Sequence, residues 1–377
     1  MVEVALRPRS ASHALIEWRR GLDWSILLAA LCLLATGLLL SLAASPAAAA
    51  RLELTDPFYF VKRQSLFAGV AVIFMLGISV MDRLWARRFA TLVFFGAILL
   101  LAYILVLGYE VKGAKRWIRI GSFGLQPSEF IKPALIVLTG WLLAQRSLYA
   151  KGPWAAITLV LFCVTLGFLL LQPDVGQSAL LAAAFVVTFY VSGLPFRWAA
   201  IFAGGGTALA GLLYATLPHV RYRINSFINP TSYDTYQLDK ASDAIARGGL
   251  LGVGPGEGTI KTVLPDAHTD FIYAVLGEEF GFLAAFGLIL LFGYIVWKGL
   301  HAAARIHDPY PRAAATGLFT LFGLQAAINI GVNVSLIPPK GMTLPFISSG
   351  GSSMLGTALT LGLALALIRR GQTSWRG

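Results

Sequence analysis

About ten apolar runs constrain the fold of this chain more than any other feature. A membrane-spanning helix needs roughly 20 mostly apolar residues, and only helices or closed barrels satisfy their backbone polar groups in lipid. Hydrophobic residues make up 57% and charged residues 13% of the 377 positions, against roughly 25% charged in soluble domains. We therefore predict an all-α polytopic membrane protein with about ten transmembrane helices and a single membrane domain, residues 1–377. The runs occupy residues 24–44, 64–81, 89–108, 130–146, 154–172, 177–193, 198–217, 271–297, 313–336 and 350–368.

The distribution of charge predicts the orientation of these helices. An even number of spans places both termini on one side, and Lys and Arg are enriched in cytoplasmic loops. With both termini inside, most short inside loops are basic and most acidic residues fall outside. We expect cytoplasmic termini and one large extracytoplasmic loop at about residues 218–270. The net charge of +12 then concerns topology and anionic lipids, and no nucleic-acid partner is expected.

An acidic segment stands where this long loop meets the next apolar run. Asp270, preceded by His268 and Thr269, lies at the predicted membrane boundary, and Glu278 and Glu279 follow inside the run. A carboxylate within a membrane segment costs about 2.5–3.5 kcal/mol, so it needs a polar cavity or a partner. Poor solvation would favour proton uptake by Asp270, which suits a general base. Alternatively, Asp270 caps a helix N-terminus, and the two glutamates are paired structural residues that hold two helices together.

Cations are concentrated in a second outside loop, residues 109–129. Lys115, Arg116 and Arg119 lie beside Trp117, on the side of the membrane where positive loops are less usual. Arginine offers a planar fork to phosphate oxygens and lysine a point charge, so this group suits a pyrophosphate. Trp117 could stack on a sugar. The alternative interpretation is a basic and aromatic belt that contacts lipid head groups.

Other polar positions have simpler local explanations. Glu129 follows Pro127, which suits the first turn of a helix, where a negative charge is favourable. Asp174 lies in a tight turn and can equally be a turn former that starts the next helix. In the long loop we predict an amphipathic helix over 238–246. The glycine-rich stretch 248–258 lacks a following Walker lysine and serine, so a nucleotide-binding loop is not expected.

Together these motifs resemble the SEDS family (shape, elongation, division and sporulation). They occur in the family's order over about residues 20–370, and two further stretches, 254–258 and 264–268, favour the division branch over the elongation branch. At Ser348 and Ser349 the chain departs from the Ser-Tyr of many members, which puts an aromatic contact there in doubt. The matching segments are Lys115-Arg-Trp-Ile118, Gln126-Pro-Ser-Glu129, Pro173-Asp174, His268-Thr-Asp-Phe271, Gly277-Glu-Glu279, Pro339-Lys-Gly-Met-Thr-Leu-Pro345 and Ser348-Ser-Gly-Gly-Ser-Ser353.

The resemblance implies a multi-pass enzyme of the bacterial inner membrane that polymerises lipid II into β-1,4-linked glycan strands during cell division. Lipid II is a disaccharide-pentapeptide on undecaprenyl pyrophosphate, and the active site would face the periplasm. The family's essential aspartate corresponds to Asp270, the expected catalytic residue, and its basic loop to Arg116 and Trp117. The expected substrate-binding residues are Lys115, Arg116, Trp117, Arg119, Glu129, Lys132, Asp174, His268, Thr269, Glu279, Lys340 and Ser352.

The sequence does not decide the cofactor or the partners, and it leaves two other classes of function open. A divalent cation, Mg²⁺ or Mn²⁺, could stabilise the pyrophosphate with Asp270 or Glu129 near the ion, although no metal ligand is assigned. The resemblance implies a class B penicillin-binding protein, a transpeptidase, and other division proteins as partners. A lipid II flippase would also need membrane carboxylates, usually near the midplane, and a non-catalytic divisome scaffold would not need Asp270. The position of Asp270 at the edge of its helix favours catalysis.

Overall fold

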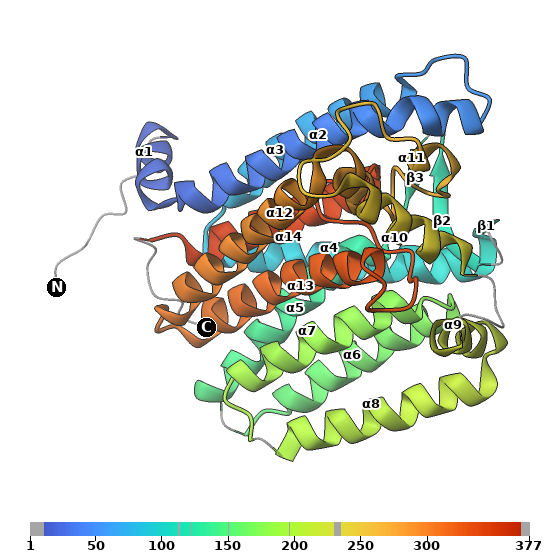
Figure 1. The fold of residues 1–377 in the computed structure, drawn as a ribbon. Helices are drawn as coiled ribbons and strands as arrows, with labels where there is room; N and C mark the ends of the chain where they lie inside the picture. Colours follow the sequence, from blue (N-terminus) through green and yellow to red (C-terminus); the bar gives the residue numbers. More distant parts are fainter. Residues whose placement is uncertain are drawn as a thin grey trace.

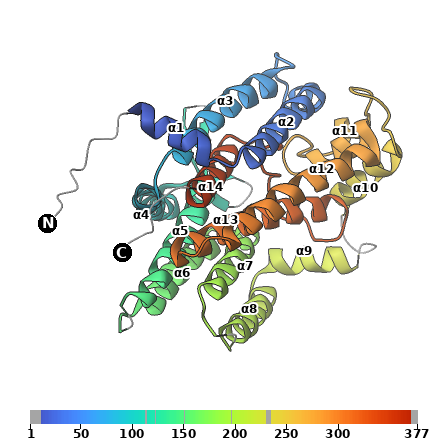
Figure 2. The same cartoon turned by 90° about the vertical axis from the view of Figure 1, so that its left-hand side faces the viewer.

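The computed structural model describes residues 11–370 except 112–113, 122, 150, 196 and 230–234. Most of its long helices run side by side and form a bundle (Figures 1 and 2). The elements are α1 (Ala11–Gly21), α2 (Trp24–Arg51), α3 (Tyr59–Ser79), α4 (Arg83–Leu107), β1 (Tyr109–Val111), β2 (Ala114–Ile120), β3 (Phe123–Leu125), α5 (Ser128–Ala144), the 3-10 helix η1 (Gln145–Ser147), α6 (Trp154–Leu171), α7 (Val175–Val191), α8 (Arg197–Thr216), α9 (Pro218–Ile228), α10 (Tyr236–Gly248), α11 (Ile260–Val263), α12 (Ile272–Ala304), α13 (Pro309–Asn333) and α14 (Gly351–Ile368).

Each of the ten apolar runs lies in a helix of its own, from α2 to α8 and from α12 to α14. Among the described residues, seven helices are long and apolar enough to cross a membrane. Helices α8 and α9 form a pair bent by 102° that would make an eighth span. Helices α5 and α7 have 17 residues each, which is short for a span. The all-α, multi-pass membrane architecture is confirmed, and ten spans remains a prediction.

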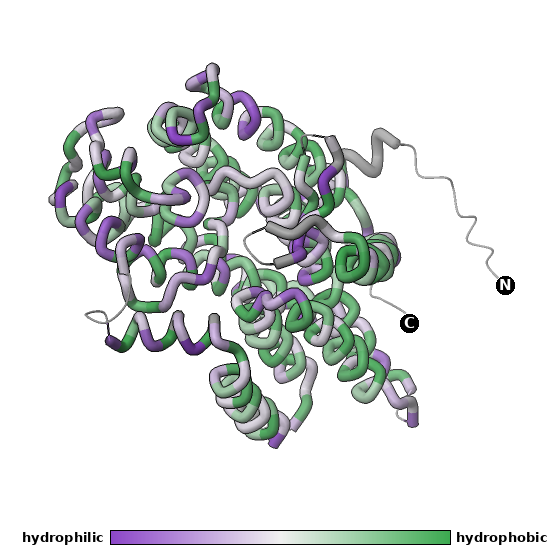
Figure 3. The backbone as a smooth tube through the Cα atoms, turned by 90° about the vertical axis from the view of Figure 1, so that its right-hand side faces the viewer, coloured by the Kyte–Doolittle hydropathy of each residue, from purple (hydrophilic) through white to green (hydrophobic). Residues whose placement is uncertain are grey.

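Three helices, α5, α13 and α14, form the centre of the bundle, and α3, α4, α7 and α12 pack around them. Nearly every residue of α5 and α14 is buried, as expected for helices that are apolar all round. Small residues allow close approach at this centre. At Gly356, for example, a Cβ would lie 2.9 Å from the backbone oxygen of Glu129. In Figure 3 the helices are mainly green, or hydrophobic, and purple hydrophilic segments gather in the connections.

The basic loop is folded into a small antiparallel sheet of order β1-β2-β3, which the sequence interpretation did not anticipate. Its central strand, β2, contains Lys115, Arg116, Trp117 and Arg119. Gly121 turns the chain into β3 with a φ of +61°, a conformation that favours glycine. The sheet adds to the helical bundle at one end, and it fixes the basic residues on a strand instead of a mobile connection.

The long loop is mostly helical, since it contains α9, α10 and α11 (Figure 1). The predicted amphipathic helix over 238–246 is confirmed as the central part of α10, which packs against α12. Helix α12 is kinked at Gly281, whose φ is +76°. The glycine-rich stretch fits against this kink, where Phe282 N donates to the Gly249 oxygen at 2.9 Å.

The two ends of the described chain meet at one end of the bundle. The backbone N–H of Arg370 donates to the oxygen of Gly21 at 3.1 Å. Asp270 lies at the start of α12, whose 33 residues lead to this same end. The described chain therefore begins and ends on one side, as the predicted even number of spans requires, and Asp270 lies on the other.

Candidate active site

Asp270 is presented by a tight turn just before α12. The backbone oxygen of Asp266 accepts hydrogen bonds from the N–H groups of Thr269 and Asp270, each at 3.0 Å. Asp266 has a φ of +52°, a left-handed conformation that Asp tolerates better than most residues. The helix N-cap is Phe271, so Asp270 does not occupy the capping position that was the alternative interpretation.

Two asparagines of α13 hold the backbone at Asp270. The side-chain amides of Asn329 and Asn333 each donate to the Asp270 oxygen at 2.9 Å, and Ala274 N donates to Oδ1 of Asn333 at 3.0 Å. Sequence reasoning missed both asparagines. Their spacing of four residues on an apolar helix was the available signal, because polar groups within a membrane segment need partners.

A polar cavity of about 950 Å³ opens beside Asp270. It brings together four of the expected residues, namely Asp270, Arg116, Trp117 and Lys340. A Cβ at Gly341 would lie 3.6 Å from Oδ2 of Asp270, so the carboxylate faces the segment that carries Lys340. Lining residues that the sequence analysis did not select include Tyr222, Ser226, Tyr236, Asp266 and Asn329.

Arg116 joins the small sheet to the turn between α6 and α7. Its Nε donates to the oxygen of Gln172 at 3.0 Å and its Nη2 to the oxygen of Pro173 at 2.6 Å, while Nη1 lies 3.8 Å from Asp174. Burial raises the pKa of Asp174 above its ordinary value, and the Arg116 charge opposes this shift. Arg116 therefore anchors strand β2 and also brings positive charge to the cavity. Asp174 is buried beside Arg116 and does not line the cavity.

The other two cations of β2, Lys115 and Arg119, lie outside the residues that line the cavity. Lys115 is half-buried and Arg119 is exposed. Their position does not test the predicted contact with substrate. Both residues add to the positive charge of strand β2, which borders the cavity.

Glu129 and Lys132 belong to a separate buried network. Lys132 Nζ donates to Glu129 Oε2 at 3.0 Å and to Gln177 Oε1 at 2.5 Å, and Gln177 Nε2 donates to Glu129 Oε1 at 2.8 Å. Gln325 continues the network, since its Oε1 accepts from Lys132 Nζ at 3.5 Å and its Nε2 donates to the oxygen of Thr343 at 3.2 Å. A paired lysine and glutamate avoid the cost of a lone buried charge. The network that includes Gln177 and Gln325 joins α5 to α7 and α13 beside the 337–349 segment. None of its four side chains lines the cavity.

His268, Thr269 and Ser352 support the site through hydrogen bonds. Ser349 N donates to the His268 oxygen at 2.9 Å and Ser348 Oγ to the Thr269 oxygen at 2.5 Å. Burial lowers the pKa of His268 below its ordinary value. Ser352 Oγ donates to the Gly124 oxygen at 2.7 Å. These bonds tie the Asp270 turn and strand β3 to the chain on either side of Gly350.

The ring of His268 also packs on Phe60 of α3, with 4.4 Å between the ring centroids. This contact fixes the imidazole against the bundle. His268 does not line the polar cavity, and its expected contact with substrate is untested.

Glu278 and Glu279 hold the glycine-rich stretch against α12. Glu278 accepts from the N–H groups of Thr259 and Ile260 at 2.8 and 2.9 Å. Glu279 pairs with the buried Lys261, whose Nζ also donates to the Gly256 oxygen at 3.0 Å. The structure thus favours the structural alternative for these two acids, although they hold a loop to a helix instead of two helices. Glu279 does not line the cavity.

Within the described part of the chain, no group of three or more His, Cys, Asp or Glu could hold a metal ion. The cavity nevertheless contains two carboxylates, Asp266 and Asp270. Mg²⁺ is commonly bound by one or two carboxylates together with substrate phosphates, so these two residues fit a substrate-bound ion. Glu129, the other predicted neighbour of a metal, lies in the separate network with Lys132.

This bundle and cavity define a multi-pass membrane protein with a polar, cation-lined site at the end opposite Gly21 and Arg370. A family model described as "Cell cycle protein", for FtsW, RodA and SpoVE, matches residues 23–373. The chain belongs to this family, which the SEDS motifs had predicted.

Individual relatives match over nearly their whole length. The chain is 46% identical to the "Probable peptidoglycan glycosyltransferase FtsW" of Caulobacter vibrioides, covering 96% of this chain and 95% of the relative. It is 34% identical to the "Stage V sporulation protein E" of Bacillus subtilis, covering 92% and 97%. These identities place the chain with the FtsW and SpoVE members, as the division-branch motifs indicated.

Two solved structures share the fold. One is described as "Structural coordination of polymerization and crosslinking by a peptidoglycan synthase complex" and has a TM-score of 0.75 at 27% identity, covering 93% of this chain and 99% of that one. The other is the rod shape determining protein RodA of Thermus thermophilus, with a TM-score of 0.70 at 28% identity and coverages of 93% and 98%. The helical architecture is therefore that of the family.

Proposed function

We propose that this protein is a peptidoglycan glycosyltransferase that polymerises lipid II into β-1,4-linked glycan strands during cell division. The single observation that carries the proposal is the cavity of about 950 Å³, which places the carboxylate of Asp270 together with the cations Arg116 and Lys340. A base and phosphate-binding cations are the groups that transfer from a sugar pyrophosphate requires. The names of the relatives support the same reaction.

In the proposed reaction, Asp270 accepts the proton of the acceptor 4-hydroxyl. That oxygen forms a bond to the anomeric carbon of the donor sugar. The bond from this carbon to the pyrophosphate oxygen breaks, and the lipid pyrophosphate leaves with the electron pair. Attack opposite the leaving group inverts the carbon and yields the β linkage. The positive charges of Arg116 and Lys340 stabilise the charge that develops on the leaving pyrophosphate.

An apolar groove adjoins the cavity and supports a lipid-linked substrate. This groove of about 580 Å³ lies between α6, α7 and α8 and includes Leu166, Phe202 and Leu209. Pro339 and Lys340 line both the groove and the polar cavity. A pyrophosphate bound at Lys340 would therefore have the polar cavity on one side, for the sugars, and the apolar groove on the other, for the lipid chain. In lipid II the pyrophosphate likewise joins the sugars to the lipid.

Trp117 and the aromatic residues of α9 and α10 supply a surface for the sugars. Trp117 is 36% exposed, and Tyr222 and Tyr236 line the same cavity. Flat rings can cover the apolar face of a sugar while their polar edges remain hydrated. A divalent ion held by Asp266 and Asp270 would add positive charge beside the pyrophosphate.

The proposed orientation places both termini in the cytoplasm and the Asp270 cavity at the periplasmic face of the inner membrane. The charge distribution supports this orientation, since the end of the bundle near the termini is rich in arginine. A class B penicillin-binding protein and other division proteins are the proposed partners. The similarity of the fold to a chain of a peptidoglycan synthase complex, in which polymerization and crosslinking are coordinated, agrees with such a partner.

The proposal is tested by an assay of glycan chain formation. Purified protein, lipid II and the penicillin-binding partner are combined with and without EDTA, and the products are separated by length. Polymer made in the presence of the partner supports the glycosyltransferase. Absence of polymer together with movement of lipid II across a vesicle bilayer would instead favour the flippase, and loss of polymer only with EDTA would identify a metal requirement.

A further inference from the structure

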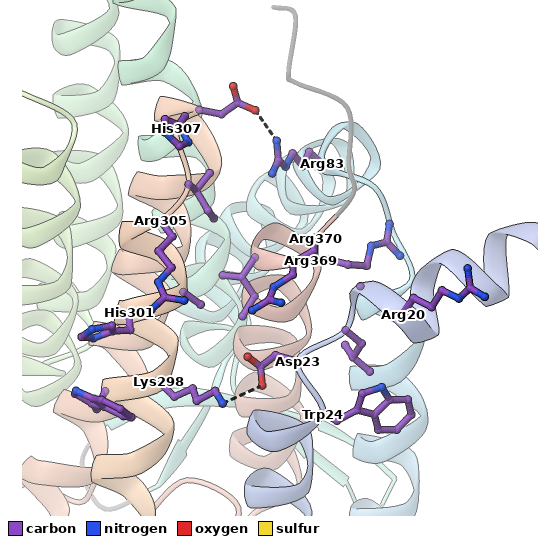
Figure 4. A pocket seen from close by; sticks show the side chains of 17 residues that line it. Arg20, Asp23, Trp24, Arg83, Lys298, His301, Arg305, His307, Arg369 and Arg370 are labelled. Carbon is purple, nitrogen blue, oxygen red and sulfur yellow. Dashed lines mark hydrogen bonds and ion pairs between the residues drawn. The ribbon is translucent and has the colours of Figure 1, made fainter.

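A second cavity, of about 910 Å³, lies at the end of the bundle opposite Asp270 (Figure 4). Its walls come from the α1–α2 connection, the last turns of α12 with the connection to α13, the start of α4, and the residues that follow α14. The proposed reaction uses none of them. Six cations line the cavity, namely Arg20, Arg83, Lys298, Arg305, Arg369 and Arg370.

Only two carboxylates line this cavity, and both are already paired. Asp308 pairs with Arg83, and Asp23 lies 4.0 Å from Lys298. Figure 4 shows these two pairs as dashed lines at separate places around the cavity. After both pairs are formed, the cavity still has an excess of four positive charges with neutral histidines.

Of the remaining arginines, Arg369 is under the influence of the negative charges of Asp82 and Glu17, which do not line the cavity. Arg369 donates to the oxygens of Val80 and Met81 at 2.9 and 3.3 Å, so its guanidinium is held in place by neutral acceptors. Among the residues that the structure describes, no carboxylate forms an ion pair with Arg305 or Arg370. Clustered like charges repel one another, so such a group is most stable with an anion bound.

Two exposed tryptophans line the cavity, on two helices that pack against each other. Trp24 begins α2 and is 43% exposed, and Trp297 on α12 is 59% exposed. Indole rings favour the level of the lipid head groups. Next to them the exposed surface is apolar, with Leu28 on α2 and Leu290 on α12. A ligand can therefore place an anionic group in the cavity and acyl chains along the helices.

We propose that this cavity binds the head group of an acidic phospholipid from the membrane leaflet at the chain-terminal end. Basic pockets between transmembrane helices are suited to such head groups. Arg305 and Arg370 bind the phosphate, and Trp24 and Trp297 lie at the level of the glycerol. The bound lipid connects the start of α2, the end of α12 and the end of α14. This site is independent of the chemistry proposed at Asp270.

The test measures lipid retention by the full-length protein with native mass spectrometry. Phosphatidylglycerol is compared with phosphatidylcholine of the same acyl chains, and inorganic phosphate is added in a separate arm. The double variant Arg305→Gln/Arg370→Gln is compared with Arg88→Gln/Lys151→Gln. The control pair removes two exposed cations that do not line the cavity.

Wild type and the control should retain phosphatidylglycerol in preference to phosphatidylcholine. The Arg305→Gln/Arg370→Gln variant should bind phosphatidylglycerol about thirtyfold more weakly, since each cation near the surface contributes roughly a fivefold factor. Arg305→Lys/Arg370→Lys, which keeps both charges, should recover most of the binding.

Three outcomes would overturn the proposal. The first is equal retention of the two lipids by wild type. The second is equal loss of phosphatidylglycerol in the test and control variants. The third is full displacement of the lipid by millimolar inorganic phosphate, which would identify a free anion as the ligand. A thermal unfolding curve for each variant distinguishes lost binding from lost folding.

Discussion

The side-chain amide of Asn333, near the end of α13, donates a 2.9 Å hydrogen bond to the backbone oxygen of Asp270. Its Oδ1 accepts the N–H of Ala274 at 3.0 Å. One side chain therefore fixes both the turn that precedes α12 and the first turn of α12 itself. The position of the candidate base depends on a neighbouring helix as well as on its own turn.

Asn333→Ala should lower both stability and activity. Removing the amide deletes the bonds to the Asp270 oxygen and from Ala274 N, each with a net worth of about 0.5–1.5 kcal/mol, while Ala274 N keeps its bond to the Phe271 oxygen at 3.0 Å. The polymerisation rate should fall, but less than in Asp270→Asn, because Asn329 still contacts the Asp270 oxygen. Thermal unfolding and the lipid II assay measure the two effects. Thr316→Ala, also on α13, is the control, and equal behaviour of the two variants would exclude a positioning role for Asn333.

Asp270→Asn should fold and insert but make almost no polymer. The amide preserves the shape of the carboxylate and cannot accept the proton, and loss of a general base costs about 10²–10⁴-fold in rate. Asp243→Asn, which alters an exposed acid of α10 paired with Lys240, should keep normal activity. Chain formation at the wild-type rate by folded Asp270→Asn would rule out the base and revive the flippase or the scaffold.

Arg116 should be sensitive even to a change that keeps its charge. Lysine cannot donate to the oxygens of Gln172 and Pro173 together as the guanidinium does. We expect Arg116→Ala to reduce lipid II polymerisation by roughly 10–100-fold, on the basis of charged hydrogen bonds, with Arg116→Lys in between. Rates are corrected for folded protein. Arg83→Ala, at the opposite end, is the control, and similar rates for Arg83→Ala and Arg116→Ala would support the lipid-belt interpretation.

The buried pair of Lys261 and Glu279 should stabilise the loop over α12. Breaking a buried ion pair by changing one partner typically costs about 3–5 kcal/mol. Lys261→Met should therefore lower the unfolding temperature strongly, and Lys261→Met/Glu279→Leu should recover part of the loss because no charge is left alone. Thermal unfolding of Lys261→Met, Glu279→Leu and the double variant beside wild type measures this coupling. A double variant less stable than the sum of both single changes would contradict it.

Labelling from outside the cell tests the orientation. In a chain with Cys32→Ala and Cys163→Ala, a cysteine replacing the exposed Glu257 should react with a membrane-impermeant maleimide on intact spheroplasts. A cysteine replacing Arg88 should react only after the membrane is opened. The reverse pattern would place Asp270 in the cytoplasm and remove the basis for polymer synthesis at the outer face.

The sequence predicted the helices of this fold well, because apolar runs of this length have few alternatives in a membrane. Local patterns also predicted α10 and the position of Asp270 at the edge of α12. The small sheet was missed, since the alternation in Ala114–Ile120 is short and lies within a basic loop. The strands pair with close sequence neighbours, such as Tyr109 with Trp117, but strand preference depends on how each face packs in the folded protein.

Within the site, sequence motifs identified residues but not their partners. Arg116 and Asp270 are 154 positions apart in the sequence, and both line one cavity. The order of the motifs along the chain could not show that these two residues meet. Glu279 and Lys132 were selected for their chemistry, yet each is occupied by a buried partner. The roles of Asn329 and Asn333 depend on the packing of α13 against the Asp270 turn, which no local pattern encodes.

Pro339 and Lys340 form a wall common to the polar cavity and the apolar groove. A shift of this short segment changes the width of both chambers at once. The carbohydrate and hydrocarbon parts of the proposed substrate would therefore be admitted together. In the proposed reaction, the spent lipid carrier would leave past the same wall along which the next donor would enter, so its departure would limit how soon the following sugar is added.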